Sequence, residues 1–231
     1  MVMVEYMMRC YNRDMDEILL IDKPAGISSF GVVARVRRIL SQRLGVKKIK
    51  VGHTGTLDPF ATGLLILLVG KATKRSNDFL KLDKEYIAEI RLGEVSTTGD
   101  PEGEITKSYS GEPVKEELIK KIVQSFVGEI SQKVPAFSAI KIDGKRAYQL
   151  ARKGIDVEMP TRKVRIYNIE ILDYSWPMLK IRTKVSSGTY IRTLGEDIGA
   201  KLGTGAYVTN LRRTKIDKYS VDDAKKLDEF I

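Results

Sequence analysis

The chain has 231 residues and a formal net charge of +10, from 40 Lys and Arg against 30 Asp and Glu. An excess of this size suits a polyanionic partner, and RNA, DNA or an anionic membrane surface would all fit it. The longest apolar run, Leu64–Val69, is far shorter than the ~20 residues of a membrane-spanning helix. We therefore exclude a transmembrane protein.

Cysteine and histidine each occur once, as Cys10 and His53. One cysteine excludes a disulfide framework and a multi-Cys zinc site, and it indicates a reducing, cytoplasmic setting. One histidine excludes a His-based triad or a His-rich metal site, so any chemistry must centre on a carboxylate. Charged residues interrupt residues 1–16, which therefore lack the apolar core of a signal peptide. We expect them to form a loose N-terminal extension.

Hydrophobic periodicity divides the first half of the chain into strands and one long helix. Ser28 or Ser29 can cap that helix, and Gly45 ends it. Tyr86 lies on the apolar face of an alternating strand, together with Ala88 and Ile90. In chain order we expect a strand at 17–21, a helix from Ser28 or Ser29 to Leu44, a buried strand at 64–69 and a strand at 85–92.

The second half predicts a polar surface loop over 96–113 and then further elements of both kinds. Leu118, Ile122 and Phe126 should face inward from the first helix. Isolated helices and hairpins, without regular βαβ units, predict an α+β fold with a mixed, mainly antiparallel sheet in one domain, 17–231. We expect helices at 114–127, 147–153, 189–202 and 220–231, the last capped by Ser220, and strands at 163–174, 178–185 and 206–214.

The segment at positions 52–65, GHTGTLDPFATGLL, is the most informative. Asp58 lies among glycines and threonines, and Pro59 fixes the backbone directly after it. A plain Asp-Pro turn is the alternative, because these are the ordinary turn residues. The order and spacing nevertheless resemble the GHTGxLDPxATGxL motif of the bacterial tRNA pseudouridine synthases of the TruB family. The resemblance implies that Asp58 is the catalytic aspartate.

Four short segments extend the resemblance: DKPAGISS at 22–29, KEY at 84–86, SGTYIR at 187–192 and LRRT at 211–214. The first, with Lys23, braces the catalytic loop in the family. Tyr86 would stack on the target base and serve in proton transfer, although a strand tyrosine is more often a core residue. Arg192 would pair with Asp58 and keep it ionised, whereas most arginines on amphipathic helices lie at the surface. Leu211 would line the uracil pocket.

Residues 133–165 resemble the family's insertion that grips the T-arm of tRNA. Lysines and arginines alternate there with Phe137 and Tyr148, a mixture suited to RNA backbone and unstacked bases. A merely solvated basic face is the alternative. One departure from the family motif is Val134-Pro135 in place of two prolines. The expected tRNA contacts in this insertion are Lys141, Arg146 and Arg152.

The resemblance covers about residues 17–227 and implies the pseudouridine synthase fold. We expect no C-terminal PUA module in this sequence, either because the module is naturally absent or because the sequence is truncated. The implied reaction isomerises the T-loop uridine of tRNA, at position 55, after the base is flipped out of the stack. Asp58 would act as nucleophile or as general base at the ribose, a choice that stays open. His53 would fill the space that the base vacates, or else hold its own turn by hydrogen bonds. His53, Thr56, Tyr190, Leu211 and Lys23 are expected to bind substrate.

An isomerisation needs no external reactant, so we expect no cofactor and no metal. The T-arm stem-loop of tRNA is the expected partner, with no obligatory protein partner and a monomeric enzyme. Two alternatives stay open: a guide-RNA-dependent pseudouridine synthase of the archaeal and eukaryotic type, and a non-catalytic tRNA-binding or RNA-folding protein. The intact set of Asp58, Tyr86 and Arg192 argues against the second, because a pure RNA binder gains nothing from a carboxylate facing phosphates.

Overall fold

The computed structural model describes residues 16–230. The expected N-terminal extension, with Cys10, and the last residue lie outside the described residues. The chain divides into two compact units, the first formed by 1–82 with 213–231 and the second by 83–212. The boundary falls inside strand β12 (Ala206–Ile216).

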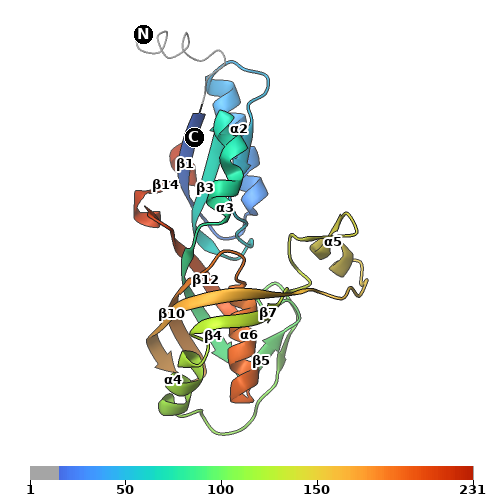
Figure 1. The fold of residues 1–231 in the computed structure, drawn as a ribbon, viewed down its shortest axis with the longest axis vertical. Helices are drawn as coiled ribbons and strands as arrows, with labels where there is room; N and C mark the ends of the chain where they lie inside the picture. Colours follow the sequence, from blue (N-terminus) through green and yellow to red (C-terminus); the bar gives the residue numbers. More distant parts are fainter. Residues whose placement is uncertain (1–15, 231) are drawn as a thin grey trace. The chain divides into compact units, whose positions relative to one another are not determined.

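Unit 1 is built on strand β3 (Thr62–Gly70), which Figure 1 labels. The side chains of β3 are buried on both faces of the strand. Leu65, Leu67 and Val69 pack with helix α2 (Ser29–Arg43). The alternate residues Leu64, Ile66 and Leu68 pack against Phe79 of α3 (Ser76–Leu80). This burial explains why β3 is a continuous apolar run and does not alternate with polar residues.

The other elements of unit 1 extend and close this sheet. Strand β1 (Asp16–Lys23) runs antiparallel to β3, with Ile21 opposite Leu65. Ser28 caps α2 by accepting a hydrogen bond from the Gly31 amide at 3.0 Å, as expected. The remaining elements are β2 (Val51–His53), η1 (Lys71–Arg75), β13 (Tyr219–Ser220), η2 (Val221–Asp223), β14 (Lys225–Lys226) and η3 (Leu227–Phe230).

Unit 2 is a sheet in the order β12-β4-β11-β10-β7 (Figure 1). The ladders between β4 and β11, β11 and β10, and β10 and β7 are all antiparallel. Along β4 the side chains alternate between buried and half-buried, and Tyr86 lies on the buried face, as predicted. Its strands and helices are β4 (Lys84–Leu92), α4 (Glu116–Gln124), β7 (Gly128–Lys133), β10 (Thr161–Ser175), β11 (Met178–Val185) and α6 (Ile191–Leu202).

Small elements complete unit 2 and lie outside its main sheet. Strands β5 (Glu94–Ser96) and β6 (Ile105–Lys107) pair with each other, as do β8 (Lys141–Ile142) and β9 (Lys145–Arg146). Helix α5 (Ala147–Ala151) follows β9. The predicted α+β fold with a mainly antiparallel sheet is confirmed.

Three local predictions are wrong. Residues 220–230 form no α-helix. Ser220 caps only the short 3₁₀ helix η2, and β14 then pairs with β1 before the second 3₁₀ helix η3, so pairing to a sheet edge overrides α-helical propensity. The segment 96–113 is not merely a surface loop, because it contains β6 and the buried Asp100. In α4 the buried residues are Ile119 and Val123, whereas Leu118 is 46% exposed, because the helix starts two residues later than expected and turns a different face inward. Phe126, just beyond the helix, is buried as predicted.

Candidate active site

The loop that carries Asp58 is a tight turn in unit 1. The Ala61 amide donates to the Asp58 carbonyl at 3.1 Å, which closes the turn around Pro59. Before it, the Thr54 amide donates to the Ile66 carbonyl at 3.1 Å and fixes the loop to β3. Leu57, directly before Asp58, is buried at 3% exposure. The backbone on both sides of the carboxylate is therefore held in place.

The segment between β1 and α2 braces this loop. Lys23 is fully buried, and its ammonium donates to the carbonyls of Pro24 (2.8 Å), Ile27 (2.8 Å) and Pro59 (3.2 Å). The hydroxyl of Ser29 accepts from the Leu57 amide and donates to the Leu57 carbonyl, both at 2.8 Å. The bracing role expected of this motif therefore has a direct geometric basis. The expected contact of Lys23 with substrate stays a prediction.

Arg213 braces the loop from a third segment, in β12. Its guanidinium is 1% exposed and donates to the carbonyls of Leu64 at 2.7 Å and Gly55 at 3.1 Å, with a longer contact of 3.5 Å to the Thr56 carbonyl. A planar group with five N–H donors can satisfy several diverging carbonyls that no single strand could pair. Arg213 thus fixes the backbone three residues before Asp58.

Gly63 makes room for the backbone of this arginine. A Cβ atom at Gly63 would lie 2.3 Å from the Arg213 carbonyl oxygen and 2.8 Å from its amide nitrogen. The φ angle of Gly63 is +103°, a region that residues with a side chain rarely adopt. Glycine is therefore required here for both space and conformation.

His53 lies at the start of the loop and hydrogen-bonds within it. Its Nδ1 accepts from the Gly55 amide at 3.4 Å. Burial lowers the pKa of His53 below its ordinary value of 6.5, and the positive charge of Arg213 lowers it further. The neutral imidazole is therefore favoured. This contact supports the loop-holding alternative, and the role of His53 in filling the space of the flipped base stays a prediction.

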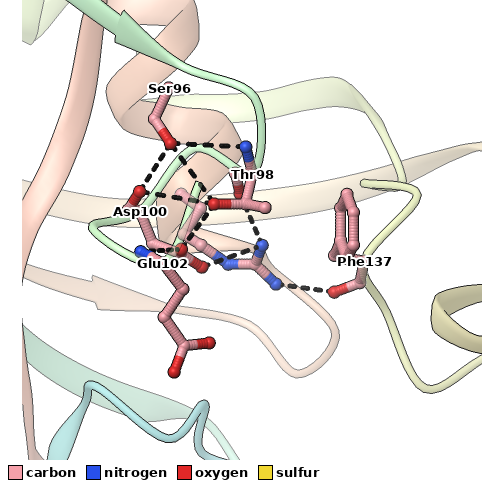
Figure 2. A network of polar contacts seen from close by, with 6 residues as sticks. Ser96, Thr98, Asp100, Glu102 and Phe137 are labelled. Carbon is pink, nitrogen blue, oxygen red and sulfur yellow. Dashed lines mark hydrogen bonds and ion pairs between the residues drawn. The ribbon is translucent and has the colours of Figure 1, made fainter. Parts of the chain in front are cut away.

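Arg192, near the start of α6, is the centre of a buried polar network in unit 2. Figure 2 shows this network, with Thr98, Asp100 and Phe137 among its labelled members. The guanidinium of Arg192 is 4% exposed and donates to the carbonyls of Thr98 at 2.7 Å and Phe137 at 2.8 Å. It also forms an ion pair with Asp100 at 3.3 Å, in which both side chains are 4% exposed. Arg192 is thus a buried cation, not the surface arginine of the alternative interpretation.

Asp100 is held by the loop that follows β5, as Figure 2 shows. One carboxylate oxygen accepts from the Thr98 hydroxyl at 2.6 Å and from the Glu102 amide at 3.0 Å. The Ser96 hydroxyl donates to the Asp100 backbone carbonyl at 2.5 Å. The carboxylate is therefore fixed independently of Arg192 and presents its other oxygen to the guanidinium.

The remaining predicted residues of the unit 2 core are Tyr86, Tyr190 and Leu211. Tyr86 is 8% exposed and Leu211 is 5% exposed. The backbone of Tyr190 exchanges two hydrogen bonds with the Gln132 side-chain amide, at 3.0 and 3.2 Å. The Arg162 guanidinium lies 5.9 Å from the centre of the Tyr190 ring, a cation–π contact. These contacts position the start of α6.

The three basic residues predicted in the insertion are exposed. Arg146 donates to the Ala139 carbonyl, and Arg152 lies 5.6 Å from the centre of the Tyr148 ring. Lys141 lies in β8, opposite Arg146. Thr56, in the unit 1 loop, is also exposed. These side chains are available to a partner, and their contacts with tRNA stay predictions.

Residues 16–230 contain no group of three or more His, Cys, Asp or Glu side chains arranged to hold a metal ion. Over the same range, no helix combines the length and apolar character that crossing a bilayer requires.

Comparison with known protein families identifies the family of this chain. The family model for the N-terminal domain of TruB family pseudouridylate synthases matches residues 37–191, and the model for the C-terminal domain of tRNA pseudouridylate synthase B matches residues 192–231. The chain belongs to the TruB family. Its similarity to tRNA pseudouridine synthase B of Phocaeicola vulgatus is 48% identity over 93% of this chain and 91% of that protein. The chain is also 46% identical to tRNA pseudouridine synthase B of Aquifex aeolicus, over 94% of this chain and 74% of that protein.

Solved structures show the same fold. The chain is 30% identical to a chain in the crystal structure of a Cbf5-Nop10-Gar1 complex, with a TM-score of 0.71 over 97% of this chain and 54% of that one. It is also 29% identical to a chain in the structure of an H/ACA RNP bound to a substrate RNA that contains 2′-deoxyuridine. That match has a TM-score of 0.67 and covers 91% of this chain and 51% of the other. This chain spans about half the length of both. The expected pseudouridine synthase fold is thereby confirmed.

The predicted TruB site residues fall into two groups. Asp58, His53, Thr56 and Lys23 belong to unit 1, where the loop and its braces form one connected hydrogen-bonded cluster. Unit 2 carries Tyr86, Arg192, Tyr190, Leu211, Lys141, Arg146 and Arg152. The pairing of Arg192 with Asp58 stays a prediction.

Two buried residues of the TruB chain were missed by sequence reasoning. Asp100 lies in the segment predicted to be a surface loop. Its carboxylate accepts hydrogen bonds from Thr98, two residues before it, and from the amide of Glu102, two residues after it, which is a common local pattern for aspartate. Arg213 was noted only as part of a basic strand. No local pattern separates it from Arg212, because its burial depends on carbonyls about 150 residues earlier in the chain.

Proposed function

We propose that this TruB protein is a tRNA pseudouridine synthase that isomerises the T-loop uridine, and that Asp58 carries the chemistry. The braced loop is the observation that supports this most directly. Asp58 lies in a turn whose flanking carbonyls are held by two buried cations, Lys23 and Arg213. A catalytic carboxylate must be held at a fixed position relative to the ribose, and a preorganised loop achieves this. The 46–48% identity to proteins named tRNA pseudouridine synthase B supports tRNA as the substrate.

The reaction breaks the bond between N1 of uracil and C1′ of ribose and forms one between C5 and C1′. A proton leaves C5 and one is gained at N1, so the product is an isomer and no oxidant or reductant is consumed. Asp58 would act at the ribose, as nucleophile or general base. Tyr86 would stack on the displaced uracil and take part in the proton transfer at C5. Since the atoms balance without another reactant, the expectation of no cofactor stands.

The geometry also supports a role for Arg192 in holding the RNA-gripping insertion. Its guanidinium binds the Phe137 carbonyl within that insertion and the Thr98 carbonyl in the loop after β5. One buried side chain thereby connects the start of α6 with two loops. We propose that the insertion binds the T-arm through Lys141, Arg146 and Arg152, and that the enzyme acts as a monomer in the cytoplasm without an obligatory protein partner.

The test uses an unmodified tRNA transcript and maps pseudouridine after incubation, with Asp58→Ala and Asp78→Ala in parallel. Asp78 is an exposed carboxylate of α3 in the same unit, so it controls for loss of one negative charge. We expect wild type and Asp78→Ala to modify only the T-loop uridine, and Asp58→Ala to bind tRNA without product. A wild-type protein that binds tRNA but forms no product, alone or with added guide RNA, would contradict the proposal and favour a non-catalytic binder.

A further inference from the structure

One stretch of the chain is strongly basic, and most of its basic residues have no part in the proposed reaction. Residues 23–57 contain eight Lys and Arg and no Asp or Glu, whereas the whole chain has a net charge of +10. Lys23 is buried as a brace, and Arg37 donates to the Val51 carbonyl at 2.9 Å. The other six lie on α2 and in the connection to β2: Arg35, Arg38, Arg43, Lys47, Lys48 and Lys50.

Helix α2 turns a basic groove outward. Arg35, Arg38 and Arg43 line it together with Ile39 and Gln42, and its volume is about 390 Å³. The side chains of Arg38 and Arg43 are exposed, and so are Lys47, Lys48 and Lys50 just beyond the helix. Arg35 is partly neutralised by an ion pair with Asp228 at 3.2 Å. From Arg35 to Arg43 the groove extends about 12 Å along the helix axis.

Helix stability does not explain this arrangement. A cation in the last helical turn favours the helix through its dipole, but the effect falls off within one turn and therefore accounts only for Arg43. Lys47, Lys48 and Lys50 lie outside the helix, and like charges placed close together repel one another. A polyanion bound along the face would remove that repulsion.

We infer that the basic face of α2 and residues 44–50 binds the phosphate backbone of the tRNA outside its T-arm stem-loop. Guanidinium groups bind phosphate oxygens in a bidentate manner, and lysines add point charges along the backbone. Phe30 is 66% exposed and lies two helical turns before Arg37 and Arg38, where it can stack on an unpaired base. A single exposed aromatic is too little apolar surface for insertion into a membrane, so RNA fits the face better than lipid.

This inference rests on the proposed function, and the two can fail separately. The test variant carries Arg38→Glu, Lys47→Glu and Lys48→Glu. The control carries Lys107→Glu, Lys115→Glu and Lys121→Glu, which are exposed residues of unit 2 outside the insertion and change the net charge equally. A Gln version of the test variant, expected to show a smaller loss, excludes effects of introduced carboxylates. Binding and initial rate are measured with a whole tRNA transcript and with the isolated T-arm stem-loop, over a range of salt concentrations.

With whole tRNA we expect the test variant to bind about tenfold more weakly, and the slope of log Kd against log salt to fall by roughly two to three, close to one per lost phosphate contact. With the stem-loop, both affinity and rate should match wild type and control. Unchanged affinity for whole tRNA would overturn the inference. An equal loss of affinity with both RNAs would also overturn it, because the face would then be part of the T-arm site. A third contrary result would be that wild type binds anionic phosphatidylserine vesicles while the variant binds tRNA as wild type does. Failure of wild type to form pseudouridine would refute the proposed function. The Kd and the salt slope would still show whether the basic face of α2 and residues 44–50 binds tRNA.

Discussion

Arg213→Met should destabilise unit 1 because it removes a buried multi-donor brace of the catalytic loop. The guanidinium makes two hydrogen bonds, of 2.7 and 3.1 Å, to the Leu64 and Gly55 carbonyls. A hydrogen bond to a charged group contributes about 1.5–3 kcal/mol, so losing two costs roughly 3–6 kcal/mol. Removal of a buried charge offsets part of this, which leaves an expected loss of about 3 kcal/mol in the free energy of unfolding.

Urea unfolding followed by far-UV circular dichroism measures this loss, and with a slope of roughly 3 kcal/mol per molar urea the midpoint should fall by about 1 M. Lys215→Met is the matched control, since Lys215 is an exposed basic residue two positions further along β12 and should change stability by less than about 0.5 kcal/mol. The single histidine gives a second readout by NMR: without Arg213 the pKa of His53 should rise. Equal midpoints for the two variants, with an unchanged His53 titration, would refute the bracing role.

Three further predictions concern individual contacts. Gly63→Ala should cost about 3 kcal/mol or more, because its Cβ would collide with the Arg213 backbone at a φ of +103°, whereas Gly52→Ala, with open space around its Cβ, should change the urea midpoint little. Asp100→Asn should cost about 3 kcal/mol because it removes the carboxylate charge of a buried ion pair, and a loss below about 1 kcal/mol in the same assay would contradict this. The pKa of His53 is lower in the folded protein than its ordinary value of 6.5. At a pH between these two pKa values the unfolded state binds more protons than the folded state, so the free energy of unfolding should fall as the pH drops below 6.5. His53→Gln should flatten that part of the stability curve, and parallel curves for wild type and variant would show that His53 does not contribute.

The elements that the sequence predicts well are those with a long hydrophobic pattern. Strand β4 alternates over its whole length, and α2 has both a serine cap and an apolar stripe, so each signal is repeated several times. Prediction failed where a few residues meet a distant partner. The end of the chain forms β14 because Lys225 pairs with Ile21 of β1, and no pattern within residues 220–231 encodes that partner.

The site shows the same division between local and distant information. Asp58 could be found because its signal is local: a shaped loop with a family motif. The buried pair of Arg192 and Asp100 could not, because neither residue differs in type from an exposed one, and only folding brings them within 3.3 Å. Burial of charged residues is the property that sequence reasoning estimates least well, since it depends on which partners fold around them.

The braces of the catalytic loop come from both sides of it in the chain, Lys23 from 36 residues before Pro59 and Arg213 from 158 residues after Gly55. The loop can therefore adopt its shape only after β1, β3 and the second half of β12 have assembled. Cations suit this task because the loop carbonyls diverge, and one ammonium or guanidinium can satisfy several acceptors that no regular strand would pair. Both cations are buried against these loop carbonyls, so a change that loosens the loop also weakens the contacts of a buried charge. For this reason the geometry around Asp58 and the stability of unit 1 should be lost together and not one after the other.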